Sequence, residues 1–263
     1  MHTLPDTSKW HDRIWASFIF FTRLPFWRIY EPPQQAYRAV VEHWALTGWF
    51  TGGLMALTYW LSSQFFPATV ALILAMGIRM LATGALHEDG LADFFDGFGG
   101  GRSRPRILEI MKDSHIGTFG VLGLVFYVLL LFLTLLSLPH EMIAMTILAA
   151  DPFSKMVTTQ LTQILPYARN ELHAKSGMVY RRMGLWSGLL VLAQGLLPLL
   201  LFFSILENGE YWTTFVFVPC LVMYALLFFI RSRIQGYTGD CCGAVVLLVE
   251  LSFYACASWI YGG

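Results

Sequence analysis

Residues 118–138 read TFGVLGLVFYVLLLFLTLLSL, a stretch without a single charged side chain. A helix needs about 20 predominantly apolar residues to cross the roughly 30 Å hydrocarbon core of a bilayer. This stretch is long enough, and it therefore predicts a transmembrane helix. The fold of the chain then depends on how often such stretches recur.

Six more apolar stretches of similar length occur along the 263 residues. Their limits are 44–66, 67–86, 142–165, 184–206, 212–230 and 243–261. Only 13% of the residues are charged, against about 25% in ordinary soluble domains. We therefore expect an all-α, polytopic transmembrane helical bundle of about seven spans, forming a single integral membrane domain over residues 1–263. The first two spans are divided by the Phe66-Pro67 pair alone, which predicts either a tight turn or a re-entrant pair of helices.

The N-terminal segment, residues 1–43, does not contain a span. Its apolar stretch at 14–22 is too short to cross a bilayer and is followed by Arg23 and Pro25. Aromatic side chains alternate there with arginines, as at Trp15 and Arg13. This mixture predicts a helix that lies in the cytoplasmic interface.

Basic residues are distributed unevenly although their number, seventeen, equals that of the acidic residues. Zero net charge gives no basic excess for counterion release, so we expect no nucleic-acid partner. Fifteen of the seventeen fall in segments 1–43, 87–117, 166–183 and 231–242, and none near 66, 139–141 or 207–211. Positive residues stay on the cytoplasmic side, so we expect the N-terminus inside and the C-terminus outside.

The candidate chemistry lies in segment 87–117, which begins HEDGLADFFDG. If the second span continues as a helix, Asp89, Asp93 and Asp96 share one face at i, i+4 and i+7. No Lys or Arg lies between residues 79 and 102 to offset their repulsion. Hard oxygen ligands suit Mg²⁺ or Mn²⁺, so we predict a divalent metal site. The alternative is an acidic helix end in contact with water.

A glycine run and three arginines follow the acidic motif. Glycines at 99–101 allow backbone amides to approach a phosphate, and arginine binds phosphate oxygens through two hydrogen bonds at once. The phosphate-binding candidates are Arg102, Arg104 and Arg106, although topology alone would also place arginines here. Lys112, Asp113 and His115 complete the segment, with Asp113 either a further metal ligand or the partner of Lys112.

Further ionisable residues lie at or within the spans. Asp240 opens the last span, where an N-terminal cap is the alternative to a functional role. Glu250 lies inside that span, with Arg79 and Lys155 as candidate partners. Asp151 lies four residues before Lys155, a spacing that also permits an intrahelical pair.

Metal-binding and phosphate-binding residues on one membrane face predict transfer of a phosphate-linked group. The sequence contains no Walker A motif, GxSxG elbow or HExxH motif. It therefore gives no support for an ATPase, a serine hydrolase or a zinc protease.

Four stretches in order, 20–26, 87–97, 104–117 and 236–240, resemble the cobalamin synthase family. The resemblance implies a Mg²⁺-dependent enzyme of the cell inner membrane, with its active site facing the cytoplasm. It implies that adenosylcobinamide-GDP is joined to α-ribazole or α-ribazole 5′-phosphate, forming adenosylcobalamin or its phosphate and releasing GMP. Pathway enzymes or a second copy of the chain are further candidate partners.

The resemblance also assigns roles within this sequence. The catalytic candidates are His87, Asp89, Asp93 and Asp96; the metal candidates are Asp89, Asp93, Asp96 and Asp113; and the substrate-binding candidates are Arg102, Arg104, Arg106, Lys112 and Asp240. The chain departs from the usual family pattern at Glu88, His115 and Leu247.

Two other functions remain open from the sequence. CDP-alcohol phosphotransferases also carry spaced aspartates on a membrane helix, but they require Ala-Arg after the first Asp-Gly, where this chain has Leu91-Ala92-Asp93. A secondary transporter would explain Arg79, Lys155 and Glu250. It predicts repeated, broken helices at the membrane midplane, whereas the polar motifs here lie on one side.

Overall fold

A computed structural model describes residues 8–169, 180–206 and 209–262, and within them the secondary structure is helical. The elements are α1 (Trp10–Phe21), η1 (Phe26–Arg28), η2 (Gln34–His43), α2 (Trp44–Ser62), α3 (Ala68–Thr83), α4 (Leu86–Gly100), α5 (Arg104–Ile110), α6 (Thr118–Leu136), α7 (His140–Ile164), α8 (Leu185–Leu206), η4 (Gly209–Tyr211), α9 (Trp212–Ile234) and α10 (Gly239–Tyr261). The predicted all-α fold is confirmed.

Each of the seven predicted spans is a helix, namely α2, α3, α6, α7, α8, α9 and α10. Among the described residues, four segments alone have the length and apolarity of a membrane span: Thr118–Leu136, Leu185–Ile205, Gly209–Ile234 and Gly239–Tyr261. The bent pair α3 and α4 makes a fifth when it is taken as one broken span. These helices make the chain a multi-pass membrane protein.

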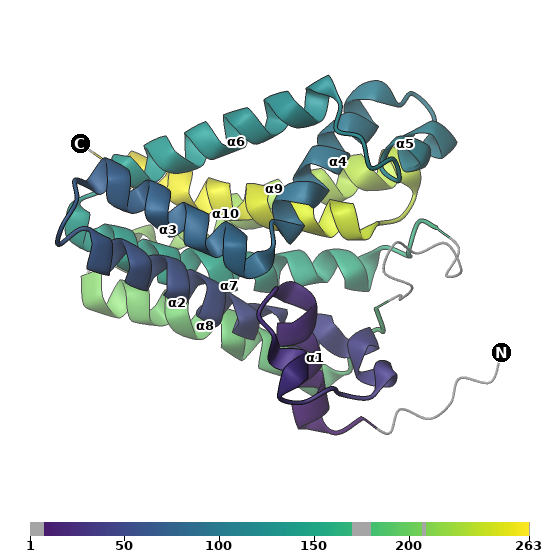
Figure 1. Cartoon of the computed structure of the whole chain (residues 1–263), viewed down its shortest axis with the longest axis horizontal. Coiled ribbons are helices and arrows are strands. Elements are labelled where there is room, and N and C mark those ends of the chain that lie inside the picture. The colour runs from purple at the N-terminus through teal and green to yellow at the C-terminus, as the bar shows by residue number, and fades with distance from the viewer. Residues whose placement is uncertain (1–7, 170–179, 207–208, 263) are drawn as a thin grey trace.

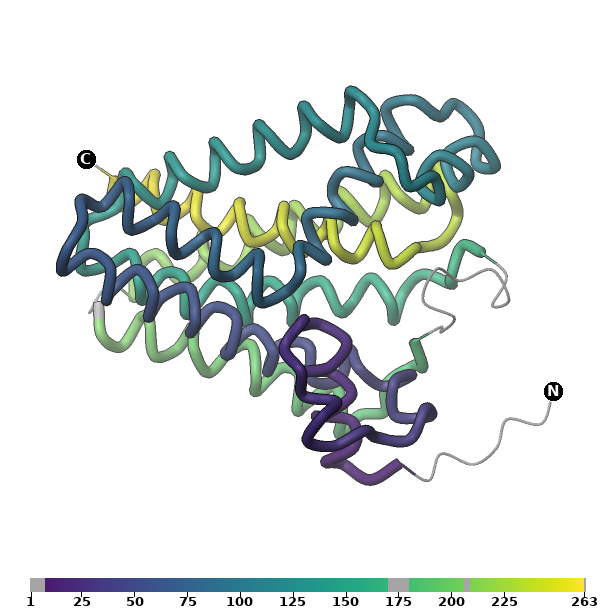
Figure 2. The backbone as a smooth tube through the Cα atoms, in the orientation of Figure 1, coloured from purple at the N-terminus to yellow at the C-terminus, as the bar shows by residue number. Residues whose placement is uncertain are grey.

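The long helices run side by side, and their connections separate into two ends (Figure 1). One end holds α1, α4, α5 and the turn between α9 and α10. The α2–α3 and α6–α7 turns and the C-terminus lie at the other end, as the backbone trace also shows (Figure 2). The connections that carry the basic residues therefore share one end, which we call the polar end.

The acidic motif does not continue the second span in a straight line. Gly84 (φ 63°) and Ala85 (φ 53°) are both left-handed, and α4 turns by 88° from α3. The Arg23 side chain lies against Gly84, and its backbone N–H donates to the Ala82 carbonyl at 2.7 Å. A Cβ on Gly84 would lie 2.1 Å from Arg23 Cγ. Residue 84 is therefore a glycine both because its φ is positive and because Arg23 packs against it. Most of segment 87–117 is helical, as α4 and α5, rather than a loop.

Ion pairs are buried among α2, α3, α7 and α10. Arg79 Nη1 donates to Glu250 Oε1 at 2.5 Å, and the Tyr254 hydroxyl donates to the same oxygen at 2.7 Å. Asp151 pairs with Lys155 one turn away and accepts a hydrogen bond from Thr51 at 2.7 Å. The intrahelical alternative for Asp151 and Lys155 is confirmed, and Arg79 is the partner of Glu250. Pairing offsets the cost of these charges within an apolar bundle.

Candidate active site

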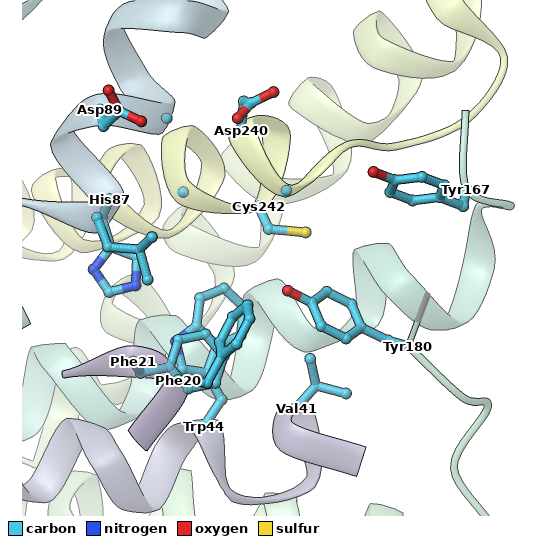
Figure 3. Close-up of a pocket in the computed structure, with 14 residues that line it drawn as sticks. Phe20, Phe21, Val41, Trp44, His87, Asp89, Tyr167, Tyr180, Asp240 and Cys242 are labelled. Carbon is cyan, nitrogen blue, oxygen red and sulfur yellow. The ribbon is translucent and has the colours of Figure 1, made fainter. Parts of the chain in front are cut away.

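A pocket of about 240 Å³ opens at the polar end, where α1, η2, α4, α10 and the segments beside Tyr167 and Tyr180 meet (Figure 3). It is lined by Phe20, Phe21, Val41, Trp44, Leu86, His87, Asp89, Gly90, Tyr167, Tyr180, Gly239, Asp240, Cys242 and Gly243. Three predicted site residues, His87, Asp89 and Asp240, therefore share one cavity although the last is far from the others in sequence.

Two glycines allow α4 and α10 to approach closely enough to form this pocket. A Cβ on Gly90 would lie 3.0 Å from the Asp240 carbonyl oxygen, and a Cβ on Gly243 would lie 3.2 Å from the His87 carbonyl oxygen. Any larger side chain would push the helices apart, because interiors are already close-packed. The Asp-Gly pair of the acidic motif thus places Asp89 and brings α4 against Asp240.

The carboxylates lie in the part of the pocket opposite its aromatic residues (Figure 3). Asp89 is exposed and Asp240 is buried, with Arg169 Nη2 3.8 Å from Asp240 Oδ2. Arg169 also donates to the Leu108 carbonyl at 3.2 Å, which fixes its guanidinium. The cap of α10 is Thr238, whose hydroxyl accepts from Cys241 N at 3.2 Å. Asp240 is therefore not the cap but lies in the first turn, where the helix dipole favours a carboxylate.

The opposite wall of the pocket is aromatic. Phe21 and Trp44 stack with centroids 5.0 Å apart and planes 9° apart, and His87 lies 5.9 Å from Trp44 at 28°. Tyr180 packs edge-on against Phe20, with ring centroids 6.2 Å apart (Figure 3), and desolvation raises the pKa of its phenol well above the ordinary value. The phenol therefore stays a neutral hydroxyl. One cavity thus combines an apolar, ring-lined half with an acidic half.

Asp96 is in a different environment from Asp89. Its Oδ2 accepts a hydrogen bond from Gly117 N at 2.7 Å, and its Oδ1 accepts one from Gly120 N at 2.8 Å. Both oxygens therefore hold the N-terminus of α6, a structural role that was not expected for this residue. Asp93 lies half-buried between Asp89 and Asp96 on α4.

The remaining predicted residues lie on α5 or in the connections on either side of it. A second hollow of about 300 Å³ is lined by Asp96, Gly100, Arg106, Glu109, Ile110, Asp113, His115, Gly117, Thr118 and Phe119. Arg106 pairs with Glu109 at 2.8 Å, and the His115 side chain and backbone N–H bond to Asp113 and lower the pKa of its carboxyl. Arg102 and Lys112 are exposed, and Arg104 donates to the Ala168 carbonyl at 3.0 Å. The structure thus divides the predicted site between two places.

The donors in the main pocket fit a magnesium ion that is shared with a substrate. Within the described ranges, no group of three or more His, Cys, Asp or Glu side chains is close enough to hold a metal by itself. Mg²⁺ usually keeps several waters and is bound by one or two carboxylates plus substrate phosphates. Asp89 and Asp240 line one pocket and supply donors of that kind.

Several pocket residues are not apparent from sequence spacing. Arg169 was counted only as a topological charge, yet its side chain lies beside Asp240. Trp44, Tyr167 and Tyr180 lie outside the four stretches that resemble the family, whereas Phe20 begins the first of them. The aromatic richness of the N-terminal segment was interpreted as contact with the membrane interface and not as part of a site.

Comparison with known proteins is consistent with these features. Residues 13–258 match the family model described as cobalamin-5-phosphate synthase. A protein of Shewanella baltica (strain OS155) named adenosylcobinamide-GDP ribazoletransferase is 32% identical over 257 residues, covering 95% of this chain and 96% of its own. The protein of that name from Shewanella oneidensis MR-1 is also 32% identical over the same shares. No solved structure matches the chain.

Proposed function

Because the chain belongs to the cobalamin-5-phosphate synthase family, we propose that it joins adenosylcobinamide-GDP to α-ribazole or α-ribazole 5′-phosphate. The family membership and the names of the relatives indicate that the chain is an enzyme of late cobalamin synthesis. Its substrates in this chain, its metal requirement and the membrane face of its site are part of the proposal.

The observation that carries the proposal is the pocket that Asp89 and Asp240 share with an aromatic wall. Joining a nucleoside to a diphosphate ester needs a place for a planar base and a place for phosphates. The aromatic half supplies contacts for the base, and the acidic half supplies hard oxygen donors on the phosphate side. Both lie at the polar end, which we assign to the cytoplasmic face of the inner membrane.

In the proposed reaction, a ribazole hydroxyl attacks the phosphorus attached to the cobinamide arm. A new phosphorus–oxygen bond forms while the hydroxyl proton passes to His87 or to one of the carboxylates, the bond from that phosphorus to the bridging oxygen breaks, and GMP leaves. Asp89 and Asp240 would hold Mg²⁺, which supplies neutralisation of the charge that develops on the phosphoryl oxygens. Arg169 keeps the Asp240 carboxylate in place. His87 lies beside both halves of the pocket and positions the acceptor.

The direct test is a product assay with the purified full-length chain. The protein is incubated with Mg²⁺, adenosylcobinamide-GDP and either α-ribazole or its 5′-phosphate, and release of GMP is followed. We expect GMP and a corrinoid product in equal amounts, and no turnover after chelation of divalent metal. Uptake of a substrate into reconstituted vesicles without product would instead support a transporter.

A further inference from the structure

Two buried nitrogen atoms of the aromatic wall have no hydrogen-bond partner among the described residues. They are Trp44 Nε1 and His87 Nε2, on side chains that are 1% and 6% exposed. A buried polar nitrogen without a partner is unfavourable, because it has given up its hydrogen bond to water and gained none in return. Both side chains line the pocket, so a ligand in the pocket is the natural partner for these atoms.

We propose that this wall is the subsite for the base of the acceptor, with Trp44 Nε1 donating a hydrogen bond to the base's free ring nitrogen. The inference rests on the proposed function and names the residues that select one of its substrates. The base of ribazole is a benzimidazole, two fused planar rings with two nitrogens. One nitrogen is bonded to ribose, and the other carries a lone pair that can only accept a hydrogen bond.

The shape and size of the pocket match this ligand. Phe20, Phe21, Trp44 and Tyr180 all line the cavity, and the rings of Phe20 and Tyr180 pack edge to face with centroids 6.2 Å apart, so a flat ring that enters the cavity meets aromatic surface (Figure 3). The cavity has a volume of about 240 Å³, which is enough to hold a planar bicyclic base.

The chemistry of the wall favours a benzimidazole over the guanine of the other substrate. Guanine presents two donor groups and several acceptors along its edges, all of which need partners when they are buried. The residues around the apolar half, Phe20, Phe21, Val41 and Leu86, have no polar side-chain atoms. The Trp44 N–H beside these apolar side chains matches the single acceptor of a base that has no donors, and the His87 imidazole and the Tyr180 hydroxyl also line this wall.

The test compares two ligands that differ by one atom. Equilibrium dialysis of the detergent-purified full chain, without adenosylcobinamide-GDP, measures binding of α-ribazole and of the analogue in which the free ring nitrogen is replaced by C–H. We expect the wild type to bind α-ribazole about three- to tenfold more tightly, the worth of one hydrogen bond. Trp44→Phe should bind the two ligands equally. Trp60→Phe, an exposed residue of the same helix, should keep the wild-type ratio.

Two results would overturn the subsite. One is a wild-type protein that does not distinguish the two ligands, a measurement that needs no variant to fold. The other is a folded Trp44→Phe protein that keeps the wild-type ratio and instead shows a raised KM for adenosylcobinamide-GDP. Discrimination in binding without any GMP release would support the subsite while refuting the proposed reaction, so the two failures are distinguishable.

Discussion

Asp89 and Asp96 lie seven residues apart on α4 and have the same side chain, yet their surroundings give them different tasks. Both carboxylate oxygens of Asp96 accept hydrogen bonds from backbone N–H groups at the start of α6, whereas Asp89 is exposed at the pocket. A carboxylate at a helix N-terminus stabilises that helix, while an exposed carboxylate at a pocket can meet a ligand. The two residues should therefore respond differently to substitution.

We expect Asp89→Asn to lower kcat on the order of 10²-fold, because a carboxylate that would hold Mg²⁺ beside the substrate phosphates is lost. Asp96→Ala should lower stability by about 1–2 kcal/mol through loss of the cap. Each folded Asp96→Ala molecule should remain active. Turnover per folded protein and thermal midpoints in detergent check both results. An inactive but fully stable Asp96→Ala protein would restore the metal role predicted for this residue.

His43 should make stability depend on pH. Gln194 accepts from Leu46 N through its oxygen, so its amide nitrogen donates to His43 Nδ1 at 3.1 Å, and burial lowers the pKa of His43 from 6.5 to about 4. Between these values the unfolded chain binds a proton that the folded chain does not. Stability should therefore fall as the pH drops from 6.5 towards 4.

Thermal midpoints across this pH range test the role of His43. We expect His43→Gln to show a flatter profile, because no group then gains a proton on unfolding at this position. His115→Gln provides a matched control, since the His115 side chain is exposed. An unchanged slope in the His43→Gln protein would assign the pH dependence to other groups.

At the scale of elements, the crossing of α4 and α10 sets the distance between the two carboxylates of the pocket. We expect Gly90→Ala to lower both stability and activity, since its Cβ would lie 3.0 Å from the Asp240 carbonyl oxygen. Overpacking of this kind costs about 1–3 kcal/mol. Gly77→Ala is the control, because a Cβ there meets no atom within 4 Å. An active, stable Gly90→Ala protein would show that the helices can move apart freely.

The positions of the helices could largely be predicted from the sequence, whereas the contacts between them could not. Apolar length alone located α6 and α10, because a bilayer imposes that length on any span. The break before α4 was missed because Ala85 adopts a left-handed conformation that its residue type does not favour. It is held by the N-terminal segment through Arg23, a contact with no local sequence pattern. The acidic spacing was correct for a helix, but only the packing of α6 shows that Asp96 is a cap.

At the scale of the whole molecule, the position of the basic connections predicts orientation. Ser114 follows α5 at the polar end, and Ser63 lies after α2 in the turn at the opposite end. We expect an impermeant maleimide to label Ser63→Cys in intact cells and Ser114→Cys only after the inner membrane is opened. The unsubstituted chain gives the background, since Cys241, Cys242 and Cys256 are buried but Cys220 is only half-buried. Labelling of Ser114→Cys in intact cells would reverse the topology.

The buried pair of Arg79 and Glu250 also constrains how the protein is made. The two residues are 171 positions apart, so the ribosome completes α3 long before α10 exists. Until then the arginine has no carboxylate partner, and α3, with only 16 residues, is poorly suited to remain in lipid alone. Stable integration of the third helix must therefore wait for the tenth. Membrane insertion of this chain is therefore complete only after its C-terminal helix has inserted. A truncation before residue 250 should leave the α2–α3 hairpin without its ion-pair partner, in a form that quality-control proteases can recognise.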